Sequence, residues 1–236
     1  MAKKNNKKEE FATEQFVEKL DRTAFNVEYF VEKYAKAIGI GLGVIIVAVL
    51  GYFAYLKLVV EPKSEDAFKE MVQAERLFDQ DSINVALNGS AGSFQGLQQI
   101  VDEYGNTDAG NLARFKAASS YYKLGDYASA VKLLEDFDTD DNVMLAQKYG
   151  MLGNALVASN KMEEGLPYYV KAAEATEVET LQSTYYTKAG QIAMELGKNA
   201  DALNYFQALE AKYPNANNGE TAKFIERLKY AAETAK

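Results

Sequence analysis

Small residues recur in this chain at an interval that matches the length of one helical hairpin, which is two helices and the turn between them. Ala118, Gly153 and Gly190 lie 35 and 37 residues apart (153 − 118 and 190 − 153), and each stands in a segment of larger, helix-favouring residues. Two helices can approach closely only where the side chains at their crossing are small, so this order predicts three helical pairs stacked in register. The second helix of each predicted pair has its own small residue, which is Ala130, Gly165 or Ala202.

Aromatic and aliphatic residues around these positions are typical of a known family. In the second unit Tyr149 is followed three residues later by Leu152-Gly153. This order resembles the tetratricopeptide repeat (TPR) family. The resemblance implies an all-α fold, an α-solenoid of TPR helical hairpins, with three TPR units over residues 111–218 and a C-terminal capping helix over residues 219–236.

A weaker copy of the repeat precedes these three units. The segment FQGLQQIVDEYGN parallels the segment LNYFQALEAKYPN of the third unit. We expect the first helix of this degenerate unit to run from Ser64 to about Gln80, followed by an inserted loop over residues 83–93. Residues 57–110 are therefore interpreted as a linker and a degenerate first repeat.

A second constraint is an uncharged stretch of twenty residues from Ala37 to Leu56. As a helix it is about 30 Å long, which is the thickness of a bilayer's hydrocarbon core. Its eleven Ile, Leu, Val and Phe residues contribute about −3 to −7 kcal/mol toward insertion. The apolar run is too long for a cleaved signal peptide, and no small-x-small cleavage site follows it. We predict a transmembrane signal anchor over residues 37–56.

Both the span and the segment before it offer contact surfaces. Gly39, Gly43 and Gly51 fall on one helical face, where small residues let another membrane helix approach closely, although glycine is also simply common in membrane helices. Residues 1–10 are predicted to form a disordered charged tail and residues 11–36 an amphipathic juxtamembrane helix. Its apolar face requires lipid or a partner protein, and its mixed polar face favours protein slightly.

Composition excludes several classes of function. The chain contains no cysteine and no histidine, which removes thiol nucleophiles, disulfides and the most familiar zinc sites and catalytic triads. Residues 1–36 carry a net charge of +1 and the remainder −9, which sum to −8. An acidic domain repels phosphate backbones, so nucleic acid is not an expected partner. We predict no enzyme, no cofactor and no metal site.

An acidic run over residues 135–141 superficially resembles a calcium loop. An EF-hand that starts at Asp136 requires glycine at its sixth position and glutamate at its twelfth, and this chain has Asp141 and Gln147 there. We therefore interpret the run as a turn between repeats, with acids at the N-terminus of the next helix.

The TPR resemblance also implies a binding groove lined by the first helix of each unit. Asn154 and Gln191 recur at the same position of successive units, and amides can hydrogen-bond an extended peptide. The alternative is that these are ordinary solvated positions of the inner helices. The candidate groove residues are Phe115, Ser119, Tyr122, Lys123, Gln147, Asn154, Val157, Thr187, Gln191 and Met194.

The order of segments resembles the ancillary subunit family of the bacterial Sec translocon, which combines a short tail, one signal anchor and an external TPR domain. This resemblance implies a single-pass protein of the bacterial inner (cytoplasmic) membrane, with a cytoplasmic N-terminus and a periplasmic TPR domain. Its expected partners are the lipid bilayer, Sec channel subunits, and a periplasmic chaperone or client polypeptide. The alternative is a structural assembly scaffold of another cell-envelope complex. Lys and Arg counts tie within about 20 residues on either side of the span, so the orientation rests on the further lysines of the tail (Lys3, Lys4, Lys7 and Lys8) and on the large folded domain, which translocates largely regardless of charge.

Overall fold

The computed structural model describes residues 33–214 and 219–234. The chain divides into two compact units, Met1–Val59 and Val60–Lys236. The predicted charged tail (1–10) and all but the last four residues of the predicted juxtamembrane helix (11–36) lie outside the described residues.

The first unit contains the uncharged stretch as a helix. Helix Lys33–Asp79 contains a segment near the N-terminus that is long and apolar enough to cross a membrane. The side chains of residues 37–55 are all exposed in the described chain. A Cβ atom added at Gly39, Gly43 or Gly51 would meet no other described atom within 4 Å, so this face has room for a second helix. Its role as a contact surface stays a prediction.

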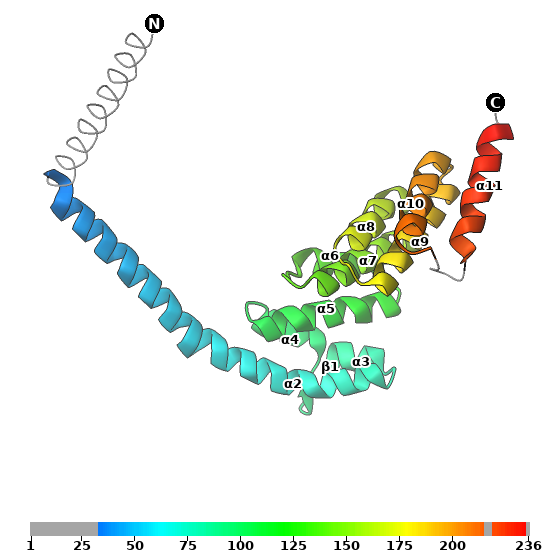
Figure 1. Ribbon diagram of the computed structural model, residues 1–236. Helices are drawn as coiled ribbons and strands as arrows, with labels where there is room; N and C mark the ends of the chain where they lie inside the picture. Colours follow the sequence, from blue (N-terminus) through cyan, green and yellow to red (C-terminus); the bar gives the residue numbers. More distant parts are fainter. Residues whose placement is uncertain (1–32, 215–218, 235–236) are drawn as a thin grey trace, which may run out of the picture. The chain divides into compact units, whose positions relative to one another are not determined.

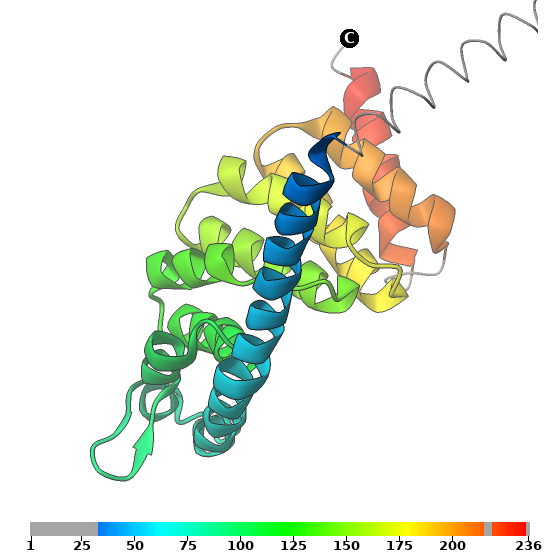
Figure 2. The same cartoon turned by 90° about the vertical axis from the view of Figure 1, so that its left-hand side faces the viewer.

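The second unit is a succession of helices joined by short turns (Figures 1 and 2). From α5 onward each helix packs mainly on the one before it and the one after it, which confirms the predicted all-α solenoid. η1 (Leu56–Val60), a π-helical segment, spans the boundary between the two units, and the elements of the second unit follow it in chain order: α2 (Glu61–Asp79), α3 (Ile83–Asn88), β1 (Gly89–Ser90), β2 (Phe94–Gln95), α4 (Leu97–Tyr104), α5 (Asp108–Lys123), α6 (Tyr127–Asp136), α7 (Asn142–Ala158), α8 (Met162–Glu174), α9 (Glu179–Glu195), α10 (Asn199–Lys212) and α11 (Glu220–Thr234).

A residue with left-handed backbone follows the first helix of every repeat. These residues are Asp81, Gly125, Asn160 and Gly197, with φ values of 60°, 83°, 62° and 72°. They reverse the chain where the next helix begins. The intervals between them are 44, 35 and 37 residues, so the first repeat is longer than the others by seven to nine residues. The four repeats are α2 with α3 and α4, α5 with α6, α7 with α8, and α9 with α10.

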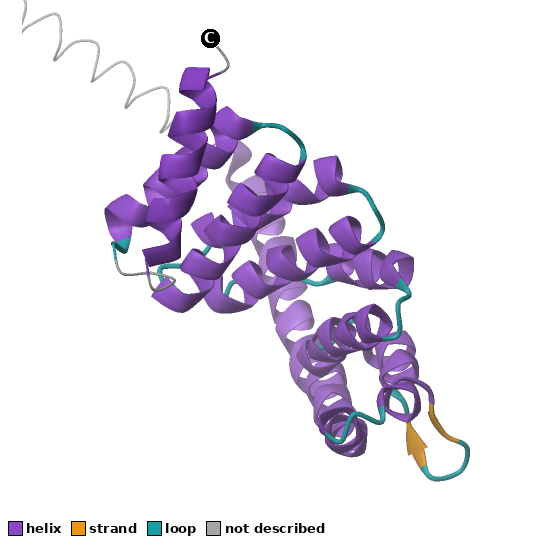
Figure 3. Ribbon diagram, turned by 90° about the vertical axis from the view of Figure 1, so that its right-hand side faces the viewer, coloured by secondary structure: helices purple, strands orange, loops and turns teal. Residues whose placement is uncertain are grey.

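The extra residues of the first repeat form a β-hairpin that divides its second helix into two shorter helices, α3 and α4. α3 and α4 contain six and eight residues, which together equal the fourteen of α10. Between them β1 pairs antiparallel with β2, and the hairpin protrudes from the helices (Figure 3). The predicted loop over residues 83–93 is therefore wrong in its first half. Ile83, Ala86 and Leu87 are buried on one face of α3, the spacing of a packed helix.

Glycines of the first helices make room for aromatic rings of the second helices. A Cβ on Gly153 would lie 2.8 Å from Cε1 of Tyr169, and one on Gly190 would overlap the ring of Phe206. The rings occupy the space that a side chain would need, so the helices of each pair approach closely. The predicted helix crossings at these two positions are confirmed.

The acidic run (135–141) ends α6 and forms the turn between α6 and α7, as the sequence predicts. Asp141 caps α7, because its Oδ1 atom accepts hydrogen bonds from the backbone N atoms of Val143 and Met144 at 2.9 and 2.8 Å. These N–H groups have no partner within the helix, and the carboxylate satisfies them. Phe137 is buried and anchors the turn.

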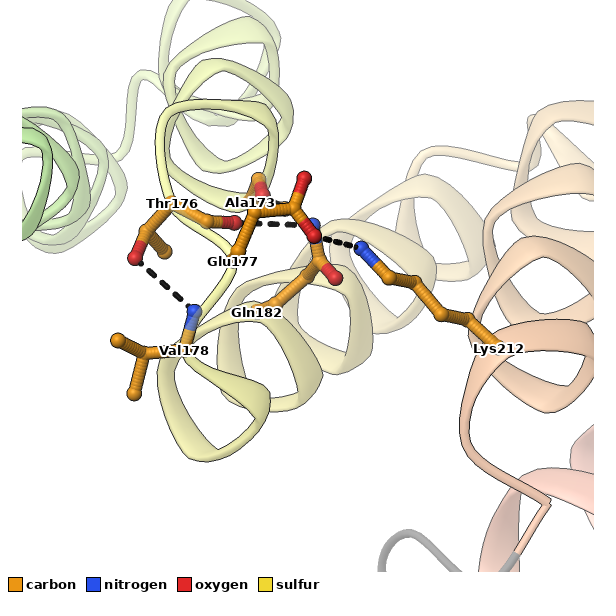
Figure 4. Close-up of polar contacts among 6 residues, drawn as sticks. All are labelled: Ala173, Thr176, Glu177, Val178, Gln182 and Lys212. Atoms are coloured by element: carbon orange, nitrogen blue, oxygen red, sulfur yellow. Dashed lines mark hydrogen bonds and ion pairs between the residues drawn. The ribbon is translucent and has the colours of Figure 1, made fainter.

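A buried glutamine joins the third repeat (α7 with α8) to the fourth (α9 with α10) (Figure 4). The Nε2 atom of Gln182 donates to the carbonyl oxygens of Ala173 and Thr176, at 2.8 and 3.1 Å. The hydroxyl oxygen of Thr176 accepts a hydrogen bond from the backbone N of Val178 at 3.1 Å. Ala173 lies in the last turn of α8, where carbonyl oxygens have no intrahelical partner, and Thr176 lies just after the helix. Gln182 therefore fixes the end of α8 against the start of α9.

A helix is present where the sequence predicts a cap (219–236). The rings of Phe206 and Phe224 stack with centroids 4.8 Å apart and planes 7° apart. Ile225 and Leu228 of α11 are buried against the preceding helices. The other face of α11 is mostly charged, as expected for the last helix of a solenoid.

Candidate peptide-binding groove

The ten groove candidates lie on α5, α7 and α9, the first helices of three successive repeats. Two of those on α5 are engaged within the domain. Phe115 packs on Phe137, with ring centroids 5.1 Å apart. The Nζ atom of Lys123 lies 3.6 Å from Oδ1 of Asp81 and 4.5 Å from the ring centroid of Phe78. These contacts hold α5 against its neighbours.

Three further candidates, on α7 and α9, are also engaged within the domain. Val157 lies at the α7–α8 crossing, where a Cβ on Gly165 would lie 2.9 Å from its Cγ2 atom. Met194 packs against the apolar core of the last repeat. The hydroxyl of Thr187 donates to the carbonyl oxygen of Ser183 at 2.7 Å.

The remaining candidates present polar groups. Ser119 and Gln147 are partly buried, and Gln191 is exposed. The ring of Tyr122 lies 5.5 Å from that of Tyr127. These side chains and Asn154 are the predicted residues with groups left to meet a ligand.

Asn154 is the centre of a polar cluster that joins two repeats. Its Oδ1 atom accepts hydrogen bonds from the hydroxyl of Tyr169 at 2.9 Å and from Nζ of Lys188 at 2.7 Å. Nζ of Lys188 also lies 5.5 Å from the centroid of the Tyr169 ring. Because Oδ1 is used twice, the Nδ2 group of Asn154 is the one left to donate to a ligand carbonyl. We call these three residues the Lys188 cluster.

The charge of Lys188 is not neutralised by the described part of the chain. Lys188 is partly buried, and no carboxylate among the described residues forms an ion pair with it. Burial lowers the pKa of Lys188. Burial also raises the pKa of Tyr169, with a smaller contribution from the Tyr122 phenol, so the Tyr169 hydroxyl stays a donor.

An internal comparison shows what the Lys188 cluster lacks. Lys116 of α5 reaches back to α2, where its Nζ atom lies 2.9 Å from Oε1 of Glu75. Lys116 and Lys188 each stand two residues before the small residue of their unit, and Glu75 and Asn154 each stand six residues before a left-handed residue. The two pairs are therefore equivalent in the solenoid, but an amide replaces the carboxylate at Asn154. Lys188 therefore occupies the position at which Lys116 forms an ion pair, but its partner Asn154 is neutral.

Sequence reasoning found Asn154 but missed both of its partners, Tyr169 and Lys188. The repeat register contains the signal, because it aligns Lys188 with Lys116 and Asn154 with Glu75. In the described ranges, no group of three or more His, Cys, Asp or Glu residues is placed to hold a metal ion. The arrangement offers hydrogen-bond donors and one cation, which suit the binding of a polypeptide.

Comparison with known proteins agrees with this architecture. A family model described as a tetratricopeptide repeat matches residues 112–139 and 186–216. No curated protein matches the chain in sequence. Two crystal structures of MamA are similar in fold, each at 14% identity, with TM-scores of 0.50 and 0.51. The matches cover 69% and 72% of this chain and 95% and 90% of the MamA chains.

A third solved structure is that of YrrB, described as a TPR protein with an unusual peptide-binding site. It is 22% identical, with a TM-score of 0.48, and the match covers 73% of this chain and 84% of the YrrB chain. The repeated crossings, the left-handed turns and the family match lead to one conclusion: this chain is an all-α protein that contains tetratricopeptide repeats.

Proposed function

We propose that this chain is a membrane-anchored protein-interaction module whose repeats bind an extended polypeptide along α5, α7 and α9. The observation that carries the proposal is the Lys188 cluster. Lys188 has an amide oxygen and an aromatic ring as partners but no anion in the described chain, so the cost of burying its charge is only partly offset unless a ligand supplies one. At the equivalent position Glu75 supplies a carboxylate to Lys116. A carboxylate of the bound segment would take that place beside Lys188.

The groups around Lys188 suit a peptide. Nδ2 of Asn154 can donate to a main-chain carbonyl oxygen, and Gln191 exposes a second amide one repeat further along. Side chains of an extended segment alternate in direction, so a carboxylate and a carbonyl oxygen of one short segment can meet neighbouring donors. The repeats would thus hold the main chain through amides and select the segment through charge.

The membrane anchor is proposed from residues 37–56. Their large apolar side chains are exposed in the described chain, among them Ile40, Val47 and Leu50 at 69%, 69% and 63%. An exposed apolar surface of this length requires lipid or a partner. The protein should therefore resist extraction of membranes with alkaline carbonate. Val47→Arg places a charge near the centre of the span, at a cost of about 3 kcal/mol, and should shift protein to the soluble fraction, whereas Val72→Arg on α2 should not.

A more specific proposal follows from the order of segments. The chain would act as an accessory subunit of the Sec translocon, in the bacterial inner membrane, and link the channel to periplasmic chaperones or emerging clients. The alternative is a structural scaffold of another envelope complex. Affinity purification from gently solubilised membranes separates the two: Sec channel subunits support the first, and subunits of a secretion, motility or cell-wall complex in their place contradict it.

Site-specific photo-crosslinking tests the groove itself. A crosslinker at Gln191 of α9 should capture a polypeptide in membranes, and one at Gln207 of α10 is the matched exposed control. Capture at Gln191 should fall at least fivefold in the Lys188→Gln variant and stay unchanged in the Lys223→Gln variant, whose lysine pairs with Glu220 on the surface. Capture at Gln207 alone would show that the binding surface lies elsewhere.

A further inference from the structure

α2 is the first helix of the first repeat, and in the described part of the chain no repeat precedes it (Figure 1). The left-handed residues give the register between repeats. Asp81 stands 44 residues before Gly125, so each residue of α2 is equivalent to the residue 44 positions later, in α5. The face of α2 that has no neighbour can therefore be compared with the face that α5 packs against the first repeat.

Most of this outer face of α2 is polar. The equivalent face of α5 is lined by fully buried residues of the core that α5 shares with the first repeat, namely Ala109, Ala113 and Ala117. The equivalent residues of α2 are Glu65, Lys69 and Gln73. Polar side chains thus end the solenoid at α2, as expected for a helix on which no further repeat stacks.

Two large apolar side chains interrupt the polar face. Phe68 and Val72 stand four residues apart, so they lie next to each other on α2. Their exposed fractions are 45% and 56%. An adjacent pair of exposed apolar side chains on a face that is otherwise polar suits contact with another molecule.

The register places Val72 at the position of Lys188. The same position is occupied by Lys116 in α5 and by Met151 in α7. Lys116 and Lys188 both reach back to the preceding repeat, and Met151 packs against the apolar core. In the described chain, Val72 is thus the member of this set without a preceding repeat to contact, and Lys188 is the member without an anion.

The register also places Phe68 in the groove, because its equivalent in α7 is the groove candidate Gln147. Phe68 and Val72 therefore lie where the proposed groove reaches the first repeat. The two ends of the groove differ in chemistry, since α2 presents apolar side chains and α9 presents a cation.

A second copy of the chain fits this end of the solenoid poorly. Copies stacked end to end would bury Glu65 and Lys69, which are both exposed and charged. Two apolar side chains also fall far short of the roughly 800 Å² that each partner of a stable interface buries. A single side chain of an extended segment needs only a contact of this size.

We infer that the polypeptide bound in the groove places a carboxylate at Lys188 and a large apolar side chain on Phe68 and Val72. The inference rests on the proposed function and adds an apolar requirement to it. Packed helices lie about 10 Å apart, so the three steps from α2 to α9 span roughly 30 Å. An extended segment advances about 3.3 Å per residue, so the acidic and apolar residues of the ligand should stand about nine residues apart.

Fluorescence anisotropy of labelled synthetic peptides, titrated with the full-length protein in detergent, tests the inference. The reference peptide carries one Asp and one Leu about nine residues apart in a background of Ser and Gln, and it is made with these two residues in either order. Replacing its Leu with Ser should raise Kd about tenfold, because the apolar contact is lost. Moving the Leu next to the Asp should have the same effect, because the side chain then no longer reaches α2.

Variants of the protein test the same contact from the other side. The double variant Phe68→Ser/Val72→Ser should raise Kd about tenfold for the reference peptide and leave binding of the Ser-substituted peptide unchanged. Val85→Ser removes an exposed apolar side chain from α3 and is the matched control, which should leave Kd unchanged. Helical circular dichroism verifies that each variant is folded.

The variant Lys188→Gln separates this inference from the proposed function. Binding that requires Lys188 but is equal for the Leu and Ser peptides would overturn the inference and retain the groove. Binding that requires the Leu side chain but not Lys188 would support the apolar site and overturn the cation site. Equal effects of the double variant and Val85→Ser would also overturn the inference. So would a smaller oligomer of the double variant in sedimentation, because Phe68 and Val72 would then join copies of the chain.

Discussion

The Nζ atom of Lys188 lies 2.7 Å from Oδ1 of Asn154, although 34 residues separate them in the chain. The contact crosses from one repeat to the next. It places a charged donor and an amide donor on neighbouring first helices, and it does so without an acidic residue. The charge of Lys188 should therefore favour the proposed binding of a carboxylate, but it lowers the stability of the domain because it is partly buried without an anion among the described residues.

Replacing Lys188 with methionine should have opposite effects on stability and on polypeptide binding. Methionine fills similar space without a charge, so the free energy of unfolding should stay the same or rise, as is common when a functional polar group is removed. Capture of polypeptide at Gln191 should fall. Urea denaturation and crosslinking on the same preparation measure both. A fall in stability together with unchanged capture would assign Lys188 a purely structural role.

The protonation of Lys188 should differ from that of Lys212. Burial lowers the pKa of Lys188 below the ordinary value of 10.5, whereas a hydrogen bond to Glu177 raises the pKa of Lys212 above it. NMR titration of the two Nζ groups should show Lys188 losing its proton first. The reverse order would contradict the buried position of Lys188.

The same shift gives a pH dependence of stability. The folded state binds the Lys188 proton less tightly than the unfolded chain does, so between the lowered pKa and 10.5 unfolding takes up a proton and the Lys188 contribution to stability rises with pH. Below that window the cost of the buried charge is present in full, and above it the cost is absent. The difference in unfolding free energy between Lys188→Met and wild type should therefore shrink as the pH rises from below the lowered pKa of Lys188 toward 10.5.

Adding one methyl group at Gly153 should be costly. In Gly153→Ala the new Cβ would lie 2.8 Å from the Tyr169 ring, so the α7–α8 pair must separate or the ring must move. Overpacking of this kind costs about 1–3 kcal/mol of unfolding free energy. In a double-mutant cycle, Tyr169→Leu should reduce the cost of Gly153→Ala because it removes the ring. Additive effects of the two changes would contradict the packing described.

Gln182 should contribute more to stability than any exposed glutamine. Gln182→Ala removes two buried hydrogen bonds and leaves the carbonyls of Ala173 and Thr176 without a donor. The expected loss is about 2–3 kcal/mol of unfolding free energy. Gln191→Ala, at an exposed position of the same helix, should change stability by less than about 0.5 kcal/mol. Thermal melts of the two variants provide the measurement.

The sequence predicts well those features of the fold that depend on nearby residues, such as helix pairs, turns and helix starts. The interval between small residues identifies the helix pairs, because close crossings depend on side-chain volume alone. The acidic run before α7 is identified as a turn because a capping carboxylate acts within three residues, as Asp141 does. The start of α2 also falls within three residues of its predicted place.

The sequence predicts distant contacts less well. Lys188 hydrogen-bonds to Asn154, which belongs to the preceding repeat, so the local sequence around Lys188 does not predict this contact. The phenol of Tyr169 reaches Asn154 only because Gly153 leaves space for its ring. The local pattern does not predict α3, because a run of six residues followed by Gly-Ser-Ala-Gly-Ser is typical of a loop. Its burial depends on α2 and α4, which the local pattern does not contain.

The interrupted second helix of the first repeat offers a position where a foreign peptide segment can be inserted into the solenoid. Because its two halves keep the length and packing of an uninterrupted one, the material between Gly89 and Gly96 can vary without shifting the repeats on either side. Any short segment whose ends meet as closely as these two glycines, such as an epitope or a fluorophore-binding peptide, should be accepted there. The hairpin position thus provides an insertion site for a foreign segment within the first repeat.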